Sequence, residues 1–307
     1  MAEVTIQGAR GAMPLYVAAP SGEGPWPGVV VISDALGMTT DLRNQADWLA
    51  QAGYLSVAPD LYYWGGRLRC MFAAMREAIA RKGEIFDDFT AVRSWIVEQR
   101  TCTGRVGVIG FCLGGGFALL LATSGDFDAS SVNYGDVPKD ALDLLADACP
   151  IVGSYGAKDP TLRGAPVNLA GALAFHGIDH DVTVYPDAGH SFLNDHDPSE
   201  APLWSLVMGK LSSSEYHEES AVKARRRIVG FFNHHLKGLE PYAGQSPVVP
   251  SINSRMMSAW PAWRAVSSIM WAAIQRSANR CPPRFPTERS SIWASATISL
   301  DRATAAS

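Results

Sequence analysis

Short apolar runs alternate along the first 240 residues with longer segments whose apolar residues recur at helical spacing. The apolar runs predict strands near residues 28–33, 55–61, 106–109, 131–135, 150–157 and 181–186. The longer segments predict helices at 40–51, 70–80, 84–99, 117–122, 166–176 and 218–236. A continuous apolar run such as 28–33 is typical of a strand that is buried on both faces of a parallel sheet. Strict alternation of strand and helix therefore predicts a doubly wound α/β fold.

The two ends of the chain depart from this alternation. Residues 4–20 predict a two-stranded hairpin with Gly8 and Gly11 in its turn. Residues 241–307 contain seven Arg, no Lys and two acidic residues, and they are rich in Ser, Ala, Pro and Trp without a clean period. We expect one domain over 1–240 and a disordered or weakly structured extension over 241–307. A docking segment and a stretch read out of frame are the alternatives for this extension.

Composition narrows the classes of partner. Of the 307 residues, 47% are hydrophobic and 18% are charged, and the net charge is -4. This charge gives no reason to expect nucleic acid or an anionic membrane, which favour basic surfaces, so a small neutral or polar ligand is the expected partner. Five cysteines without a C-x-x-C pair suggest neither a disulfide framework nor a zinc site. Free thiols and the lack of a signal peptide or a long apolar span predict a cytoplasmic protein.

One cysteine lies among glycines between a predicted strand and a predicted helix. The sequence Gly110-Phe111-Cys112-Leu113-Gly114 fits the G-x-nucleophile-x-G elbow, which exposes a nucleophile on a sharp turn. A helix N-terminus stabilises a thiolate at Cys112, and the N–H of Leu113 would face a developing oxyanion. The alternative is a small buried cysteine at a tight crossing of strand and helix.

A thiol nucleophile needs a base and a group that orients the base. Asp159 follows the strand predicted at 150–157, and His190 follows the strand predicted at 181–186. Both therefore lie at the carboxyl edge of the sheet, in the order nucleophile, acid, histidine. We interpret the remaining histidines as surface or packing residues, namely those at positions 176, 180, 196, 217, 234 and 235. Asp187 and Asp195 are closer to His190 along the chain but are more typical of loop hydrogen-bond acceptors.

The segments VVVISDALG, GYLSVAPDLY, VGVIGFCLGGG, YGAKDP and YPDAGHSF together resemble the dienelactone hydrolase family of α/β-hydrolases. The resemblance extends over nearly all of residues 1–238 and implies an α/β-hydrolase fold. It implies Cys112 as nucleophile, His190 as base and Asp159 as the residue that orients the base. It also implies Ala35, after the strand that ends at Ser33, as the second N–H donor of an oxyanion hole.

Two positions depart from the family's prototype. The prototype has a glutamate that pairs with the resting thiol where this chain has Asp34, which either exchanges a proton with Cys112 or accepts backbone hydrogen bonds in its loop. The prototype also has a substrate-binding arginine where this chain has Asn194, and a neutral amide does not replace a guanidinium. A second substrate-binding arginine of the prototype corresponds to either Arg67 or Arg69.

The expected function is hydrolysis of a small ester or lactone through an acyl-enzyme, with no metal or organic cofactor. Aromatic residues after the strands either shape a substrate pocket with Asn194 or simply pack, and these are Tyr62, Trp64, Tyr134 and Phe192. A thioesterase or acyl transferase with the same triad is one alternative. A thiol-based redox sensor without turnover is the other. The sequence leaves the oligomeric state open.

Overall fold

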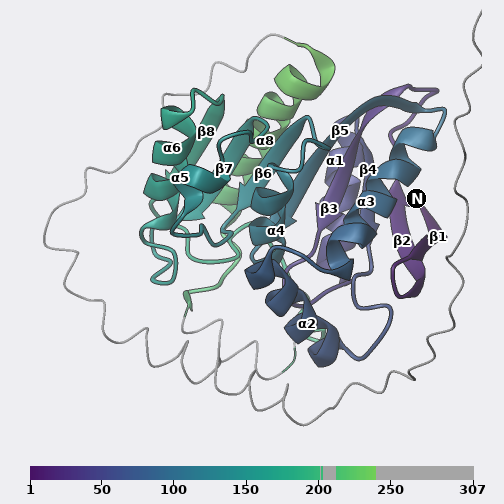
Figure 1. Ribbon diagram of the computed structural model, residues 1–307, viewed down its shortest axis with the longest axis horizontal. Helices are drawn as coiled ribbons and strands as arrows, with labels where there is room; N and C mark the ends of the chain where they lie inside the picture. Colours follow the sequence, from purple (N-terminus) through teal and green to yellow (C-terminus); the bar gives the residue numbers. More distant parts are fainter. Residues whose placement is uncertain (201, 203–211, 240–307) are drawn as a thin grey trace, which may run out of the picture. The chain divides into compact units, whose positions relative to one another are not determined.

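The computed structural model describes residues 1–200, 202 and 212–239, and over these residues it is built on one eight-stranded sheet flanked by helices (Figure 1). The strands are β1 (Ala2–Gly8), β2 (Gly11–Ala18), β3 (Trp26–Ile32), β4 (Leu55–Pro59), β5 (Cys102–Phe111), β6 (Ala129–Asn133), β7 (Ile151–Gly156) and β8 (His180–Tyr185). The helices are α1 (Thr40–Gln51), α2 (Arg67–Ala80), α3 (Glu84–Glu98), α4 (Leu113–Leu121), α5 (Ala141–Leu144), α6 (Ala165–Phe175) and α8 (Glu218–Lys237).

The strand order is β1-β2-β4-β3-β5-β6-β7-β8. β1 and β2 form an antiparallel hairpin in which Gly8 is opposite Gly11, and β2 is antiparallel to β4. All the later pairings are parallel. The predicted doubly wound α/β fold is confirmed. Because the parallel strands end at one edge, the loops after β3, β5, β7 and β8 open at the same side of the sheet.

The apolar run in β3 is explained by burial on both faces of the sheet. Val30 and Ile32 belong to the core under α3 and α4, where Phe89 and Phe117 pack with ring centroids 5.3 Å apart. The alternate residues of β3 join the second core, which α1 and α8 cover. Side chains alternate between the faces of a strand, so helices on both sides require every residue of such a strand to be apolar.

Element boundaries differ from the predictions at a few places. α2 begins at Arg67 instead of residue 70, and α4 begins at Leu113 instead of residue 117. The four-residue helix α5 was not predicted. The extension expected over 241–307 lies outside the described residues, so that expectation stays a prediction.

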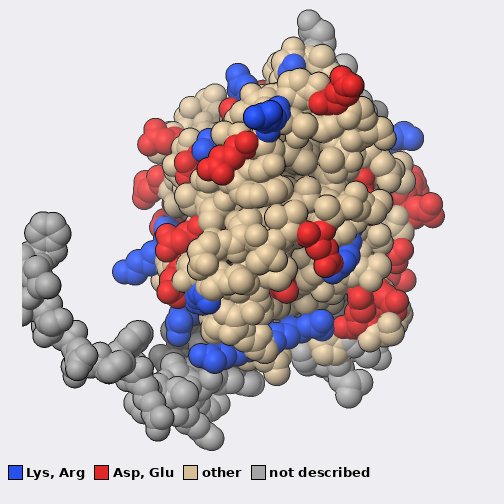
Figure 2. Space-filling model, turned by 90° about the vertical axis from the view of Figure 1, so that its right-hand side faces the viewer, with Lys and Arg blue, Asp and Glu red and all other residues tan. Residues whose placement is uncertain are grey.

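Two observations bear on the expected partners. Acidic and basic side chains are intermingled on the face shown in Figure 2, and neither sign covers that face. Within the described part of the chain, no helix is both long enough and apolar enough to cross a membrane.

Candidate active site

The glycines around Cys112 allow β5 to turn directly into α4. Cys112 has φ 53° and ψ -111°, a conformation that few residues other than glycine adopt and that is often found at functional sites. A side chain at Gly110 would collide with the Gly114 carbonyl, and a side chain at Gly114 would collide with the carbonyl of Ser33. Gly116 differs, because no atom of the described residues lies within 4 Å of the place a Cβ would take. The tight crossing thus depends on Gly110 and Gly114 but not on Gly116.

His190 and Asp159 come together from the loops after β8 and β7. Nδ1 of His190 lies 2.6 Å from Oδ2 of Asp159. The other carboxylate oxygen accepts hydrogen bonds from the backbone N–H and the hydroxyl of Thr161, at 2.8 and 2.6 Å. Asp159 is only 2% exposed. These contacts fix the carboxylate and therefore the orientation of the imidazole.

The second ring nitrogen of His190 faces Cys112. Burial by itself lowers the pKa of His190, but the charge of the Cys112 thiolate and hydrogen bonds to Asp159 and to Cys112 raise it to about 10. His190 is thus positioned between the Asp159 carboxylate and the Cys112 sulfur.

Two backbone N–H groups, of Leu113 and Ala35, have no hydrogen-bond partner among the described residues. Leu113 is the first residue of α4, so its N–H has no partner within the helix. The N–H of Ala35 likewise has no hydrogen-bond partner among the described residues. The Ala35 carbonyl accepts a hydrogen bond from the hydroxyl of Tyr62 at 3.2 Å, which helps to hold this peptide in place. The loop after β3 and the start of α4 can thus each supply one donor to an oxyanion.

A buried polar network lies behind His190. The Tyr134 ring is 5.2 Å from the His190 ring, and the Tyr134 hydroxyl donates to the side chain of Asn194. The Asn194 amide in turn donates to Asp41. Burial raises the pKa of Asp41, against the effect of the Asn194 hydrogen bond. Both polar ends of Asn194 are therefore occupied by protein groups.

Comparison with known proteins assigns the chain to a family. Residues 13–236 match the dienelactone hydrolase family. The chain belongs to that family. It is 28% identical over 251 residues to the "Putative carboxymethylenebutenolidase" of Yersinia pestis, over 76% of this chain and 88% of the relative. An Escherichia coli K12 protein of the same name is 29% identical over 237 residues, over 72% of this chain and 82% of the relative.

A solved structure agrees with this assignment. The "Putative Dienelactone Hydrolase" from Klebsiella pneumoniae subsp. pneumoniae MGH 78578 has a TM-score of 0.61 and 27% sequence identity. The match covers 75% of this chain and 97% of that structure. The α/β-hydrolase fold and a dienelactone hydrolase-like hydrolase are thus confirmed as predicted.

Within this dienelactone hydrolase family member, Asp34 has a partner that the sequence did not indicate. Its Oδ2 lies 2.8 Å from Nε2 of His196, and its Oδ1 accepts the N–H of Leu36 at 2.8 Å. No hydrogen bond between Asp34 and Cys112 is found in the described residues. His196, interpreted from sequence as a surface or packing residue, is instead 22% exposed at its side chain and pairs with Asp34. Pairing of Asp34 with the thiol stays a prediction.

The residues proposed for a substrate pocket occupy different environments. Phe192 is fully buried and packs on Tyr134 at a centroid distance of 5.6 Å, so it supports the site from behind. The Trp64 ring carries the guanidinium groups of Arg10 and Arg69, at 4.6 and 5.0 Å from its centroid. No contact between the Trp64 ring and Cys112, Asp159 or His190 is found in the described part of the chain. The Tyr134 ring, by contrast, packs against His190.

Two of the other cysteines, Cys70 and Cys149, are less suited to nucleophilic chemistry. Burial raises the pKa of Cys70, and burial raises the pKa of Cys149 to about 12. Both thiols are therefore protonated at neutral pH and react slowly.

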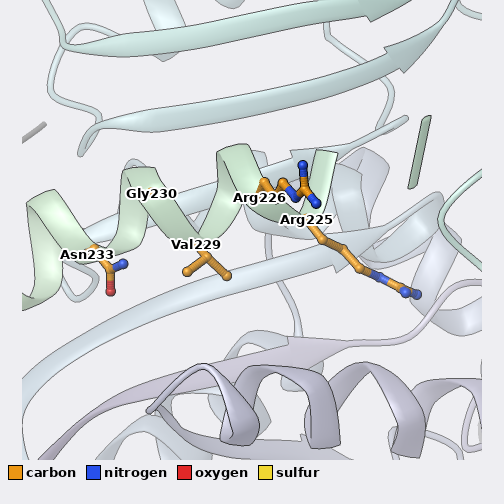
Figure 3. A pocket seen from close by; sticks show the side chains of 5 residues that line it. All are labelled: Arg225, Arg226, Val229, Gly230 and Asn233. Carbon is orange, nitrogen blue, oxygen red and sulfur yellow. The ribbon is translucent and has the colours of Figure 1, made fainter. Parts of the chain in front are cut away.

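A further hollow of about 360 Å³ lies along α8 (Figure 3). Its walls are formed by Arg225, Arg226, Val229, Gly230 and Asn233. None of these residues belongs to the constellation at the elbow, and the set offers neither a nucleophile nor a base.

Sequence reasoning did not find the contacts that join the loops around the site. Thr161, Asp41 and His196 are polar residues in loops or at a helix start, and nothing in their local pattern separates them from residues in water. The signal for Thr161 was its position two residues after Asp159, because a carboxylate often accepts from groups two residues ahead. His196 and Asp41 carried no such local signal.

Proposed function

We propose that this protein hydrolyses small esters or lactones through a covalent intermediate on Cys112. The Cys112 thiolate attacks the carbonyl carbon, and the N–H groups of Leu113 and Ala35 stabilise the oxyanion that forms. The imidazolium of His190 gives its proton to the departing alkoxide as the C–O bond breaks. His190 then takes a proton from water, the hydroxide attacks the thioester, and the thiolate returns.

One observation carries this proposal: His190 is held by Asp159 at 2.6 Å on one side and faces the strained Cys112 on the other. A cysteine used only for packing has no need of a positive φ or of a buried imidazole–carboxylate pair beside it. Membership of the dienelactone hydrolase family and relatives named as carboxymethylenebutenolidases support an ester or lactone substrate. No metal or organic cofactor enters any of these steps.

The proposal does not extend to substrates that need a bound carboxylate. The resemblance places the prototype's carboxylate-binding arginine at Asn194, and Asn194 is 5% exposed with its amide engaged by Tyr134 and Asp41. An amide offers no cation to a substrate anion. We therefore expect neutral esters and lactones to be hydrolysed at least as well as their carboxylated counterparts.

Hydrolysis of a short-chain aryl ester by single variants tests the mechanism. Cys112→Ala and His190→Ala should each lower kcat by a factor of about 10³ or more, and Asp159→Asn by about 10² to 10⁴, as for other triads. Cys102→Ala is the matched control, because it removes a free thiol that the mechanism does not use. Intact-mass spectrometry after mixing with the ester should show an acyl adduct on the wild type but not on Cys112→Ala.

Two results would contradict the proposal. Unchanged turnover in Cys112→Ala, with the Cys102→Ala control also unchanged, would exclude a cysteine nucleophile. An adduct that appears on a peptide without Cys112 would place the covalent chemistry elsewhere.

A further inference from the structure

Three metal-binding side chains meet at the edge of the sheet opposite the candidate active site. His234 and His235 lie in the last turn of α8, and Asp179 lies immediately before β8. One ligand atom from each of the three lies within 4.8 Å of the others. His190 of the candidate active site follows the last residue of β8, whereas Asp179 precedes the first residue of β8. The candidate active site and the three side chains are therefore separated by the length of this strand.

Both backbone segments that carry these side chains are anchored. The Asp179 carbonyl accepts the N–H of Ile151 at 3.1 Å, which ties this loop to β7. α8 ends at Gly238 with φ 65°, and the N–H of Leu239 returns to the Asn233 carbonyl at 3.1 Å. Such a closed C-terminus keeps the last turn from fraying. A ligand that binds here therefore does not have to order the backbone first.

The histidine rings are held in orientations that suit metal ligation. Nδ1 of His234 contacts the Leu239 carbonyl at 2.9 Å, which makes Nδ1 the protonated nitrogen and leaves the lone pair on Nε2. Metal-binding histidines commonly use their other N–H in this way. The His235 ring packs against the Phe231 ring at a centroid distance of 4.3 Å, so its position is also constrained.

Nε2 of His235 faces the carboxylate of Asp179. It is buried and lies 3.1 Å from Oδ2 of Asp179, at ion-pair distance but without a hydrogen bond of good geometry among the described residues. A cation placed between the ring nitrogen and the carboxylate would satisfy both groups.

We propose that Asp179, His234 and His235 form a site for a divalent transition-metal ion of the zinc class. Two imidazole nitrogens with one carboxylate oxygen suit zinc, whereas magnesium and calcium prefer oxygen ligands alone. Tetrahedral coordination places ligand atoms about 3.4 Å apart, so the three atoms must draw together. The exposed Asp179 side chain has the freedom to close this gap. A water molecule takes the fourth position, and the ion links the end of α8 to the start of β8.

Calorimetric titration of the full-length chain with Zn²⁺ tests the site. The Cys112→Ser variant is used throughout, so that zinc bound by the active-site thiol is not counted. We expect one equivalent of Zn²⁺ to bind, with affinity at least about tenfold weaker in His235→Ala and in Asp179→Asn. His176→Ala is the control, since this histidine contacts the Leu142 carbonyl and belongs to no ligand cluster of the described residues. It should bind Zn²⁺ as tightly as the parent.

Two further measurements make the outcome decisive. Zn²⁺ at a hundred times its Kd should raise the Tm of the parent by roughly 5 °C or more and leave the Tm of Asp179→Asn nearly unchanged. Co²⁺ should give the strong visible absorption of a tetrahedral site in the parent alone. If His235→Ala does not fold, the exposed Asp179→Asn carries the test by itself. No saturable binding by the parent, or equal binding by all variants, would overturn the proposal.

Discussion

Exchanging His196 for glutamine breaks the ion pair between the loop after β3 and the loop after β8. Nε2 of His196 lies 2.8 Å from Oδ2 of Asp34. Burial by itself lowers the pKa of His196, but the hydrogen bond and charge of Asp34, with the charges of Asp41 and Glu200, raise it above its ordinary value. A histidine with a raised pKa in the folded state stabilises the fold fully below about pH 6.5. This stabilisation is lost as the pH rises through the raised folded value.

The magnitude follows from how far the pair is removed from water. The side chains of His196 and Asp34 are 22% and 9% exposed, so the pair is neither fully exposed nor fully buried. A surface ion pair contributes up to about 1 kcal/mol to stability, and disruption of a buried one costs about 3 to 5 kcal/mol. We therefore expect a coupling of about 2 kcal/mol at pH 6. Above the folded pKa a neutral imidazole still donates one hydrogen bond, so about 1 kcal/mol should remain.

Urea unfolding of a double-mutant cycle measures this coupling without reference to activity. The cycle consists of the wild type, His196→Gln, Asp34→Asn and the double variant, each unfolded at several pH values between 6 and 10. Glutamine and asparagine keep polar side chains of similar size while removing the charges. A coupling below about 0.3 kcal/mol at pH 6, or one that increases with pH, would refute the reasoning.

Three other predictions concern the elbow and its surroundings. Gly110→Ala places a methyl group against a carbonyl of α4 and should lower the free energy of unfolding in urea by more than about 3 kcal/mol. Gly116→Ala adds its methyl group in open space on α4 and should raise the free energy of unfolding by about 0.5 to 1 kcal/mol. The pKa of His190 is raised to about 10, so kcat/KM for an ester should stay constant up to pH 9. It should fall above about pH 10, because His190 then lacks the proton that it gives to the leaving group. A decline that begins at pH 7 would contradict this. Tyr134→Phe removes the hydrogen bond from the hydroxyl to Asn194 but keeps the ring beside His190. We expect the free energy of unfolding to fall by about 1 to 2 kcal/mol and kcat to change less than tenfold. A larger loss of kcat would show that the hydroxyl has a direct role.

The fold was predictable from sequence because the signals that define it are local. A strand such as β3 that faces helices on both sides needs an unbroken apolar run, and the hairpin needs glycines at its turn. The errors arose where these signals fade. The glycines at the start of α4 carry no helical period although the helix already includes them, and α5 is only four residues long.

The positions of Cys112, Asp159 and His190 were accessible from sequence for a related reason. Each follows a recognisable strand, and parallel strands bring their ends to one edge whatever the intervening loops do. The contacts of Asn194 were not accessible, since its partners Tyr134 and Asp41 are 60 and 153 residues away and nothing local relates them. The sequence Asn194-Asp195-His196-Asp197, which follows His190, has the polar composition of a solvent-exposed segment.

Yet the burial of His196 follows from the placement of His190. For His190 to reach Cys112, the loop after β8 must turn toward the middle of the sheet, where the loop after β3 also ends. Six residues beyond His190 that loop has reached Asp34, and the backbone N–H of Asp195 already bonds Asp41 at 2.9 Å. The polar residues after His190 thus lie against the loop that contains Asp34 and Ala35. A carboxylate in that loop has a partner ready, and in this chain the partner is a histidine whose charge depends on pH.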